Sequence, residues 1–403
     1  MSASLNRPMA GVTDQDVRFD CPRGGCRRRT SFHAGVVVWA GLSVATFAQL
    51  PESAEKFTSL DVGQAKELVR RNVRLLDLNG VTTLSYDAAV ALKRSDDETY
   101  DHIWLLLDGL TSLSPQVAKV LCEGEWDRLS LNGLTTISPE TAKALAARLG
   151  GRRLCLNGLK SLSPEVAKEL GECVDVELNG VQEVSDSVGI ALTEAATSTI
   201  RLNGLTSLPA RAARAWVSHQ REHTGGGEIF LNGLTELPSD LAAALGPQIG
   251  ALFLDGVTTL PPNVAKALSP EDEKDSHSLS LNGLRAISPE SAAHLGQSYG
   301  SLSLNGLTSL SPEVAVALAR GKRRSPLYLN GLSEISVEAA DALGGHQGEL
   351  VLNGLTVISE DVAKALSRHS GDLVLNGLRT MTPEAAKALQ SNPKVEMPPR
   401  FRR

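Results

Sequence analysis

The chain has 403 residues, of which 42% are hydrophobic, 21% charged and only 4% aromatic. Its formal net charge of −6 excludes the strong positive field of a nucleic-acid-binding protein, whose cationic residues cluster on one face. The apolar fraction is also too high for a disordered chain. We therefore expect a folded protein with no nucleic-acid partner.

The N-terminal residues have the order of an export signal. Arg27, Arg28 and Arg29 precede an uncharged run, 34–48, that ends in small residues. A basic, an apolar and a small-residue region in this order are typical of a secretory signal, and the arginine pair loosely matches a twin-arginine signal. The apolar run is shorter than the roughly 20 residues that span a bilayer. We predict a signal peptide over residues 1–48 and an exported protein of the cell envelope or extracellular space, with an uncleaved N-terminal anchor as the alternative and the only membrane contact.

Residues 49–72 are predicted to form an N-terminal cap. The stretch Phe57–Val69 reads FTSLDVGQAKELV and matches only the helical half of the repeat that follows it. Terminal units of a solenoid are atypical, because a full repeat at the end would expose the face that packs against a neighbour.

A repeat then fills residues 73–392. An Asn-Gly or Asp-Gly dipeptide recurs thirteen times at spacings of 22 to 29 residues, and self-similarity at such a period is typical of a solenoid or propeller. The first residues of the dipeptides are Asn79, Asp108, Asn132, Asn157, Asn179, Asn203, Asn232, Asp255, Asn282, Asn305, Asn330, Asn353 and Asn376.

Each repeat contains a predicted short strand and a turn. In the unit SLSLNGLTSLSPEVAVAL, Leu302 and Leu304 flank a serine, and this period-two alternation indicates a strand with one buried face. We expect the glycine after Asn305 to adopt a positive φ, which a branched residue would resist.

The second half of the repeat predicts a short helix. Ser311 suits the N-cap and Pro312 the first helical position. Val314, Ala315 and Leu318 share one face of such a helix. Each unit is therefore predicted to consist of a strand, a turn, a helix and a loop.

One unit buries too little surface to be stable alone, so the units must stack. The predicted fold class is α/β: a curved solenoid of about 13 strand–turn–helix units with one parallel sheet. Val395–Met397 offers a last short strand, so residues 393–403 are predicted to be a C-terminal cap strand followed by a basic tail.

The regular leucines, the asparagine after the strand and the strand-plus-helix unit resemble leucine-rich repeat proteins, in particular bacterial arrays of the LNGLTSLSPEVAKAL type. The resemblance covers about Lys56 to Gln390. It implies a concave strand face that binds a protein partner. The usual L-x-x-L-x-L-x-x-N-x-L spacing is not kept, because Asn305 follows Leu304 directly.

The asparagines of the dipeptides are predicted to form a structural ladder, with side-chain amides that satisfy backbone groups at the turns. An ionised carboxylate cannot donate, so looser or water-mediated turns are expected at Asp108 and Asp255. A calcium ladder is the alternative, but it needs clustered carboxylates at a nine-residue period, which the sequence lacks.

The sharpest catalytic motif is His219-Gln220-Arg221-Glu222-His223. On a helix the two histidines could hold zinc, with Glu222 acting on a water molecule. The string runs into Thr224-Gly225-Gly226-Gly227, however, which ends helices. We predict no metal, no cofactor and no enzyme activity, and a zinc metalloenzyme is the remote alternative.

Three cysteines follow the predicted signal, Cys122, Cys155 and Cys173. An odd count at scattered positions is no disulfide framework. Cys155 and Cys173 fall in one repeat and could pair in an oxidising compartment.

The middle residues of the L-x-L strands point away from the leucines. Phe230 and Phe253 are neighbours in this series, and Tyr328, Val351 and Val374 form a second run. Exposed aromatic neighbours in a chain so poor in aromatic residues predict a binding patch. The alternative is that strands favour such residues in any case.

Three units are longer than the rest, at 93–102, 219–227 and 269–278, and such insertions reach one edge of a solenoid, a common binding surface. Basic loops occur near Arg152 and Arg153 and at 322–324. The sequence therefore predicts an exported, non-catalytic scaffold that binds a protein through its concave strand face and edge loops. A self-associating structural envelope protein is the alternative.

Overall fold

A computed structural model describes ten ranges of the chain. They are 58–70, 74–93, 103–124, 126–147, 152–193, 199–224, 226–248, 250–269, 277–320 and 325–402. The chain forms two units, Met1–Ser53 and Ala54–Arg403, and all described residues belong to the second. The predicted export signal at 1–48 lies outside the described residues.

The second unit, which contains all the repeats, is built on one parallel sheet of fourteen strands, and the order of the strands in the sheet follows their order along the chain. The strands are β2 (Leu75–Asp77), β4 (Trp104–Leu106), β5 (Arg128–Ser130), β6 (Arg153–Cys155), β7 (Asp175–Glu177), β8 (Thr199–Arg201), β9 (Gly227–Phe230), β10 (Gly250–Phe253), β11 (His277–Ser280), β12 (Leu302–Ser303), β13 (Leu327–Tyr328), β14 (Leu350–Val351), β15 (Leu373–Val374) and β16 (Val395–Glu396). A separate parallel pair is formed by β1 (Ser59–Leu60) and β3 (Thr83–Leu84).

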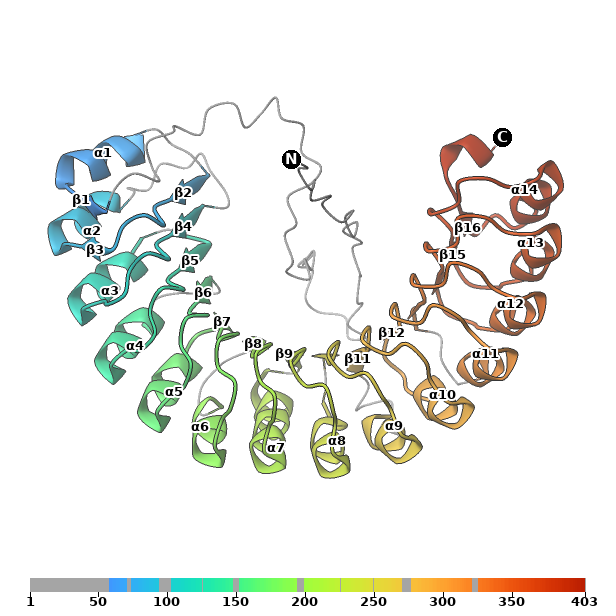
Figure 1. Ribbon diagram of the computed structural model, residues 1–403, viewed down its shortest axis with the longest axis horizontal. Helices are drawn as coiled ribbons and strands as arrows, with labels where there is room; N and C mark the ends of the chain where they lie inside the picture. The colour runs from blue at the N-terminus through green and yellow to red at the C-terminus, as the bar shows by residue number, and fades with distance from the viewer. Residues whose placement is uncertain are drawn as a thin grey trace, which may run out of the picture. The chain divides into compact units, whose positions relative to one another are not determined.

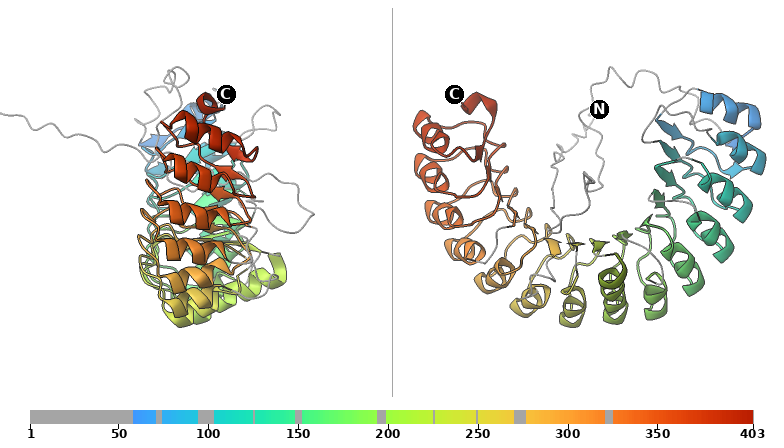
Figure 2. Two further views of the ribbon diagram at one scale, coloured as in Figure 1. Left: turned by 90° about the vertical axis from the view of Figure 1, so that its right-hand side faces the viewer. Right: turned by 180° about the vertical axis from the view of Figure 1, so that it is seen from behind.

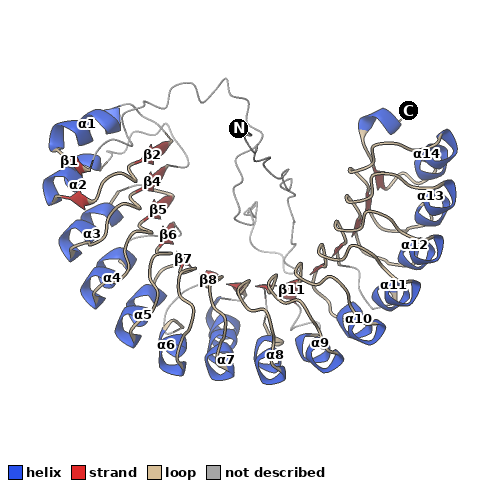
Figure 3. Cartoon of the chain, in the orientation of Figure 1, coloured by secondary structure: helices blue, strands red, loops and turns tan. Residues whose placement is uncertain are grey.

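One α-helix belongs to each sheet strand from β2 to β15, and one such strand and helix form one coil of the solenoid. Each helix packs against the helices of the adjacent coils. The helices are α1 (Val62–Arg70), α2 (Tyr86–Leu92), α3 (Pro115–Cys122), α4 (Pro139–Ala146), α5 (Pro164–Gly171), α6 (Asp186–Ala191), α7 (Ala210–His219), α8 (Ser239–Leu245), α9 (Pro262–Leu268), α10 (Pro289–Gly296), α11 (Pro312–Ala319), α12 (Val337–Gly344), α13 (Glu360–Leu366) and α14 (Pro383–Gln390). Within this second unit of the chain, the strands line the inner side of a curve and the helices its outer side (Figures 1 and 3). Seen edge-on, the coils form a single stack (Figure 2). The predicted α/β solenoid with one parallel sheet is confirmed.

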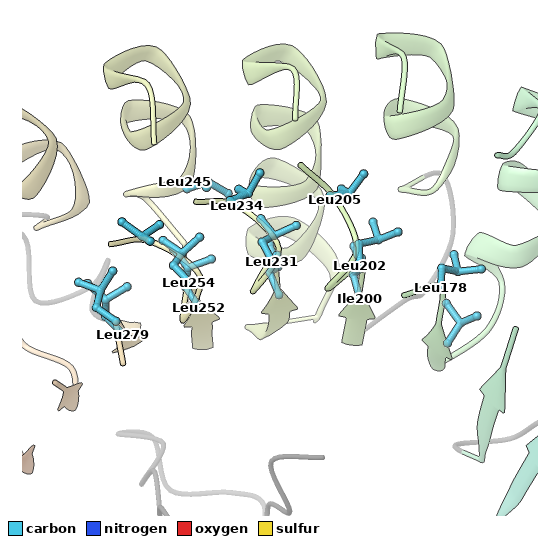
Figure 4. Close-up of a cluster of buried hydrophobic side chains, with 14 of the residues drawn as sticks. Leu178, Ile200, Leu202, Leu205, Leu231, Leu234, Leu245, Leu252, Leu254 and Leu279 are labelled. Carbon is cyan, nitrogen blue, oxygen red and sulfur yellow. The ribbon is translucent and has the colours of Figure 1, made fainter. Parts of the chain in front are cut away.

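The core lies between the sheet and the helices. Leu252 and Leu254 from β10 and its turn are fully buried, as is Leu245 from α8, and their side chains reach the leucines of the adjacent coils (Figure 4). Because every coil supplies the same leucines, the core is continuous along the array. Truncation of one such buried leucine typically costs about 2–5 kcal/mol.

Side-chain caps define where most helices begin. In ten of the described helices a Ser or Thr side chain accepts the backbone N–H three residues on, as Ser311 does from Val314. The exceptions include α7, α8 and α9, which follow Pro209, Pro238 and Pro261 and have no side-chain cap. A serine or threonine side chain therefore sets where most of the described helices begin.

The two ends of the array differ from the repeats between them. Asp61 and Gln64 form a reciprocal cap at the start of α1, with side-chain oxygens that accept each other's backbone N–H, which is the geometry of a capping box. At the other end β16 adds one more strand beside β15. The Gln390 side chain then donates to the carbonyl of Phe401, which holds the last turn of the chain against α14.

The expected positive φ at the Asn-Gly glycines is wrong. Among the described glycines, only Gly226 and Gly250 have a positive φ. From the second dipeptide onward the constraint is space: a Cβ on Gly306 would lie under 3.0 Å from the carbonyl oxygens of Asn282 and Leu284. Glycine is required there because the backbones of adjacent coils approach closely.

Candidate functional site

The side chains of the dipeptide residues connect all thirteen units. At each of the twelve steps, the side-chain oxygen of one residue accepts the backbone N–H of its equivalent in the next unit at 2.8–3.2 Å. Asn305, for example, accepts from the backbone N–H of Asn330 at 2.8 Å. A backbone donor is satisfied at every step.

The expectation of looser turns at the two aspartates is wrong. Asp108 accepts the backbone N–H of Asn132 at 2.8 Å, and Asp255 accepts that of Asn282 at 2.9 Å. Each carboxylate oxygen also accepts the hydroxyl of a serine in the next strand at 2.6 Å. The physical reason is that this position is used as an acceptor, which a carboxylate provides as well as an amide does.

The concave face of the sheet consists of two columns of side chains. We call them the first and the third column, after the position of their residues in each strand triplet. The central residue of each strand triplet, such as Leu129 or Leu154, points into the core, so the first and third residues both point to the concave side. In the first column Trp104, Arg128 and Arg153 lie side by side on adjacent strands. The third column contains the five residues predicted as a binding patch.

The two phenylalanines lie next to each other on this face but are not exposed. Phe230 and Phe253 stack with their ring centroids 4.1 Å apart and are only 8% and 9% exposed. Tyr328 and Val351 are also buried, and Val374 is half-buried. The expectation of an exposed aromatic patch is wrong, because strands about 4.8 Å apart let neighbouring side chains cover one another.

Ion pairs connect the first half of the concave face. Glu177 on β7 pairs with Arg128 at 3.3 Å and with Arg153 at 3.4 Å, and Arg153 also pairs with Asp175 at 3.1 Å. The Arg128 guanidinium lies over the ring of Trp104, 5.7 Å from its centroid. Trp104 is 41% exposed and is the large apolar side chain that this end of the face presents to solvent.

The same network continues to the phenylalanine stack. Arg201 on β8 pairs with Asp175 and, at 3.8 Å, with Glu228. Its guanidinium also lies 4.6 Å from the centroid of Phe230, on the side opposite Phe253. Aromatic rings, arginines and carboxylates therefore form one continuous surface from β4 to β10, which we call the concave network.

Burial dominates the acid–base behaviour of this surface. It raises the pKa of Glu228 to about 7, and the Arg201 charge only partly opposes the effect. Burial likewise lowers the pKa of the Arg201 guanidinium. Cys155, at the third position of β6, has its thiol pKa raised by burial and by Glu177.

Cys155 and Cys173 do not pair: both are free and buried, as is Cys122. Burial raises the pKa of the Cys122 and Cys173 thiols to about 12. These three thiols therefore remain protonated near neutral pH and lack the nucleophilicity of a thiolate.

The H-x-x-E-H string crosses the end of a helix. His219 is the last residue of α7, and Gln220–Thr224 continue as a π-helix, η2. Glu222 is exposed, and the side chain of His223 lies outside the described residues. In the part of the chain that the structure describes, no group of three or more His, Cys, Asp or Glu side chains could hold a metal ion. Within the same ranges no helix is long and apolar enough to cross a membrane.

The first column of the concave face is not predicted from the sequence. Arg153 is expected in a basic loop, and no site is expected at Trp104, Arg128, Asp175 or Glu228. A signal for the column does exist in the sequence. Each of its residues lies immediately before the first core residue of an L-x-L or equivalent strand, two residues before the outward residue of the third column.

The chain matches no family model and no curated protein. Among solved structures it is similar to the yeast complex of Rad7 and Elc1, with 16% identity and a TM-score of 0.42 over 84% of this chain and 88% of that chain. It is also similar to the Drosophila Toll–Spatzle complex, with 15% identity and a TM-score of 0.33 over 76% of this chain and 43% of that chain. Both are similarities of backbone path alone.

Proposed function

We propose that this chain is an exported, non-catalytic leucine-rich-repeat-type scaffold that binds another protein through its concave face and edge loops. The observation that carries the proposal is the concave network, which joins Trp104, three arginines and the Phe230–Phe253 stack on one side of the sheet. Tryptophan and arginine are the residue types most enriched at the energetic centres of protein interfaces. The resemblance of the repeats to bacterial leucine-rich repeats supports the same function.

A binding role fits this surface better than a catalytic one. The arginines and carboxylates of the concave network form ion pairs with one another. The thiol within it, Cys155, is buried, and its pKa is raised, whereas an activated nucleophile needs a neighbouring base or a lowered pKa. Export is proposed from the basic and apolar segment at 27–48.

The experiment compares three forms of the full chain as bait in envelope and extracellular fractions. The concave variant is Trp104→Ser with Arg153→Ser, and the control is Tyr86→Ser, which removes a 53%-exposed aromatic side chain from the helical side. Captured proteins are identified by mass spectrometry, purified, and their dissociation constants measured. We expect a partner whose affinity falls about tenfold or more for the concave variant, a loss of at least about 1.4 kcal/mol, and is unchanged for the control.

Equal affinity of all three forms for every purified partner would rule out the concave face as the binding site. If no partner is captured and the purified chain instead assembles with rising concentration, the self-associating structural role replaces the proposal. Sedimentation velocity over a range of concentrations distinguishes these two results.

A further inference from the structure

The ladder fixes the direction of each asparagine amide. Its oxygen accepts a backbone N–H of the next coil, so the nitrogen at the other end of the same planar group must point toward the concave face. Asn132 and Asn305 show this direction, because their side-chain nitrogens donate at 2.8 Å to Ser130 and Ser303. Those serines occupy the third strand position, two residues earlier in the chain.

Where the third position is not a serine, this internal acceptor is missing. Eight ladder asparagines follow such a residue, and two of them, Asn157 and Asn376, donate instead to Glu177 and Glu396. Of the other six, Asn79 and Asn179 follow the acidic residues Asp77 and Glu177, whereas the remaining four, Asn203, Asn232, Asn330 and Asn353, follow Arg201, Phe230, Tyr328 and Val351. Among the described residues, nothing accepts a hydrogen bond from these four amide nitrogens, and none of the four is a buried unsatisfied atom. They are therefore donors that are not fully buried, in two pairs on adjacent coils.

The surroundings of the donors favour a neutral acceptor. Arg201, beside the first pair, is neutralised by Asp175 and Glu228, and the second pair borders Tyr328 and Val351. An amide nitrogen carries no net charge and bonds equally well to an uncharged carbonyl. A ligand that combines carbonyl oxygens with apolar groups matches both pairs.

A polypeptide matches this description better than a carbohydrate does. A sugar ring stacks on an open aromatic face, and both faces of Phe230 are covered, one by Phe253 and the other by the Arg201 guanidinium. The two rings are only 8% and 9% exposed, and the small part that remains for contact suits aliphatic or aromatic side chains.

We propose that the side-chain nitrogens of Asn203, Asn232, Asn330 and Asn353 donate hydrogen bonds to main-chain carbonyls of an extended polypeptide segment laid along the concave face. This inference rests on the proposed function and specifies the chemistry of its partner. The apolar side chains of the segment contact the phenylalanine stack at one pair and Tyr328 and Val351 at the other. The side-chain oxygen of each asparagine then stabilises the fold, and its side-chain nitrogen binds the ligand.

The chain itself supplies the substitution that separates these two roles. Asp108 and Asp255 support the ladder with oxygen alone, so Asn203→Asp and Asn353→Asp keep the acceptor and remove only the donor. Asn305→Asp is the matched control, because its nitrogen is already bonded to Ser303 and it adds the same single charge. Circular dichroism and thermal melting verify that all three variants fold.

The probes are peptides enriched from a random twelve-residue display library on the immobilised full chain, then synthesised and measured by fluorescence anisotropy. We expect Asn203→Asp or Asn353→Asp to weaken binding about tenfold, the effect of one lost hydrogen bond in a desolvated contact. Asn305→Asp is expected to change it less than about twofold, because it removes no donor from the ligand.

Three results would overturn the inference. If peptides bind all three variants equally but lose affinity for Trp104→Ser with Arg153→Ser, the concave face binds proteins without the amide nitrogens, and the proposed function stands. If the enriched peptides are insensitive to every concave variant, both proposals fail. If no peptide is enriched and a panel of neutral oligosaccharides is bound instead, the ligand is a carbohydrate.

Discussion

The Asn-Gly dipeptide holds adjacent coils together through two different physical effects. The asparagine oxygen accepts a backbone N–H of the next coil, as Asn305 does from Asn330. The glycine leaves room for the carbonyl oxygen of the preceding coil, which a Cβ would displace. Neither effect involves a positive φ. The dipeptide also lies at the centre of a turn, in which the Leu307 N–H donates to the Leu304 carbonyl at 3.1 Å, so it combines the predicted turn with close packing.

Replacing a dipeptide glycine by alanine should destabilise the array. In Gly306→Ala the new methyl group meets the carbonyl oxygens of Asn282 and Leu284, and because these are backbone atoms the coils must separate. The expected loss is about 1–3 kcal/mol, as for other overpacked sites. The midpoint of urea unfolding measures it.

Gly63→Ala is the control for this change. An added methyl group there meets only a side-chain oxygen of Asp61, and alanine is the better helix former by up to about 1 kcal/mol. An equal shift for both substitutions would contradict the close-approach explanation.

The ladder predicts that asparagine can be replaced by aspartate but not by alanine. Asn330→Ala leaves the backbone N–H of Asn353 without its acceptor, which should cost about 1–3 kcal/mol. Asn330→Asp keeps the acceptor and should lower the unfolding midpoint far less. Unfolding in urea at high salt, where charge effects are screened, compares the two variants, and equal losses would argue against the acceptor role.

At the scale of the element, ten of the described helices begin where a serine or threonine side chain caps them. Ser311→Ala removes the acceptor for the backbone N–H of Val314 and should cost about 0.5–2 kcal/mol. Ser309→Ala, at an exposed position two residues earlier, should leave stability unchanged. Thermal unfolding followed by circular dichroism tests the difference, and no difference would show that proline alone starts the helix.

The strand pair β8–β9 should make stability depend on pH. The pKa of Glu228 is raised from 4.5 to about 7, so the folded state binds more protons than the unfolded state between these values. Stability should therefore fall by up to ~3 kcal/mol as pH rises through this window, and level off above it.

Glu228→Gln is neutral at every pH and should remove this slope. Urea unfolding midpoints from pH 4.5 to 8 measure it for both proteins. If both proteins have the same slope, Glu228 does not titrate in this range.

The elements were predictable because their signals are local. The alternation at Leu302 and Leu304 and the cap at Ser311 lie within one unit, and the structure places a strand and a helix there. The exposure of Phe230 was not predictable, because it depends on Phe253, 23 residues away in the sequence and 4.1 Å away in the sheet. The sequence of a single unit carries no signal for the packing between coils. The concave network could not be predicted because it is formed by that packing.

At the scale of the whole molecule, and within the ranges that the structure describes, the extensive contacts lie within one coil or between adjacent coils. The Arg128–Glu177 ion pair, from β5 to β7, reaches one coil further. Each described helix packs against its immediate neighbours, and each strand pairs with the next. In such quasi-one-dimensional folds, stability is a sum of unit and neighbour terms. A destabilising substitution in the middle of the array should therefore destabilise mainly the coils around it.

Leu254→Ala tests this locality. The side chain is fully buried, and its truncation should cost about 2–5 kcal/mol. Amide hydrogen exchange should accelerate in the coil of β10 and α9 and in the coils on either side, but not near β4 or β15. Val357→Ala, at a 58%-exposed position, is the control, and uniform acceleration along the chain would indicate one cooperative unit.

The ladder also has a direction. Every side-chain oxygen in it accepts from the coil that follows, from Asn79 toward Asn376. A growing polypeptide is made in that same order, so each finished coil already holds the acceptor for the coil still being synthesised. Coils can be added one at a time at the C-terminal end, and none has to wait for a later segment before its own acceptor is in place.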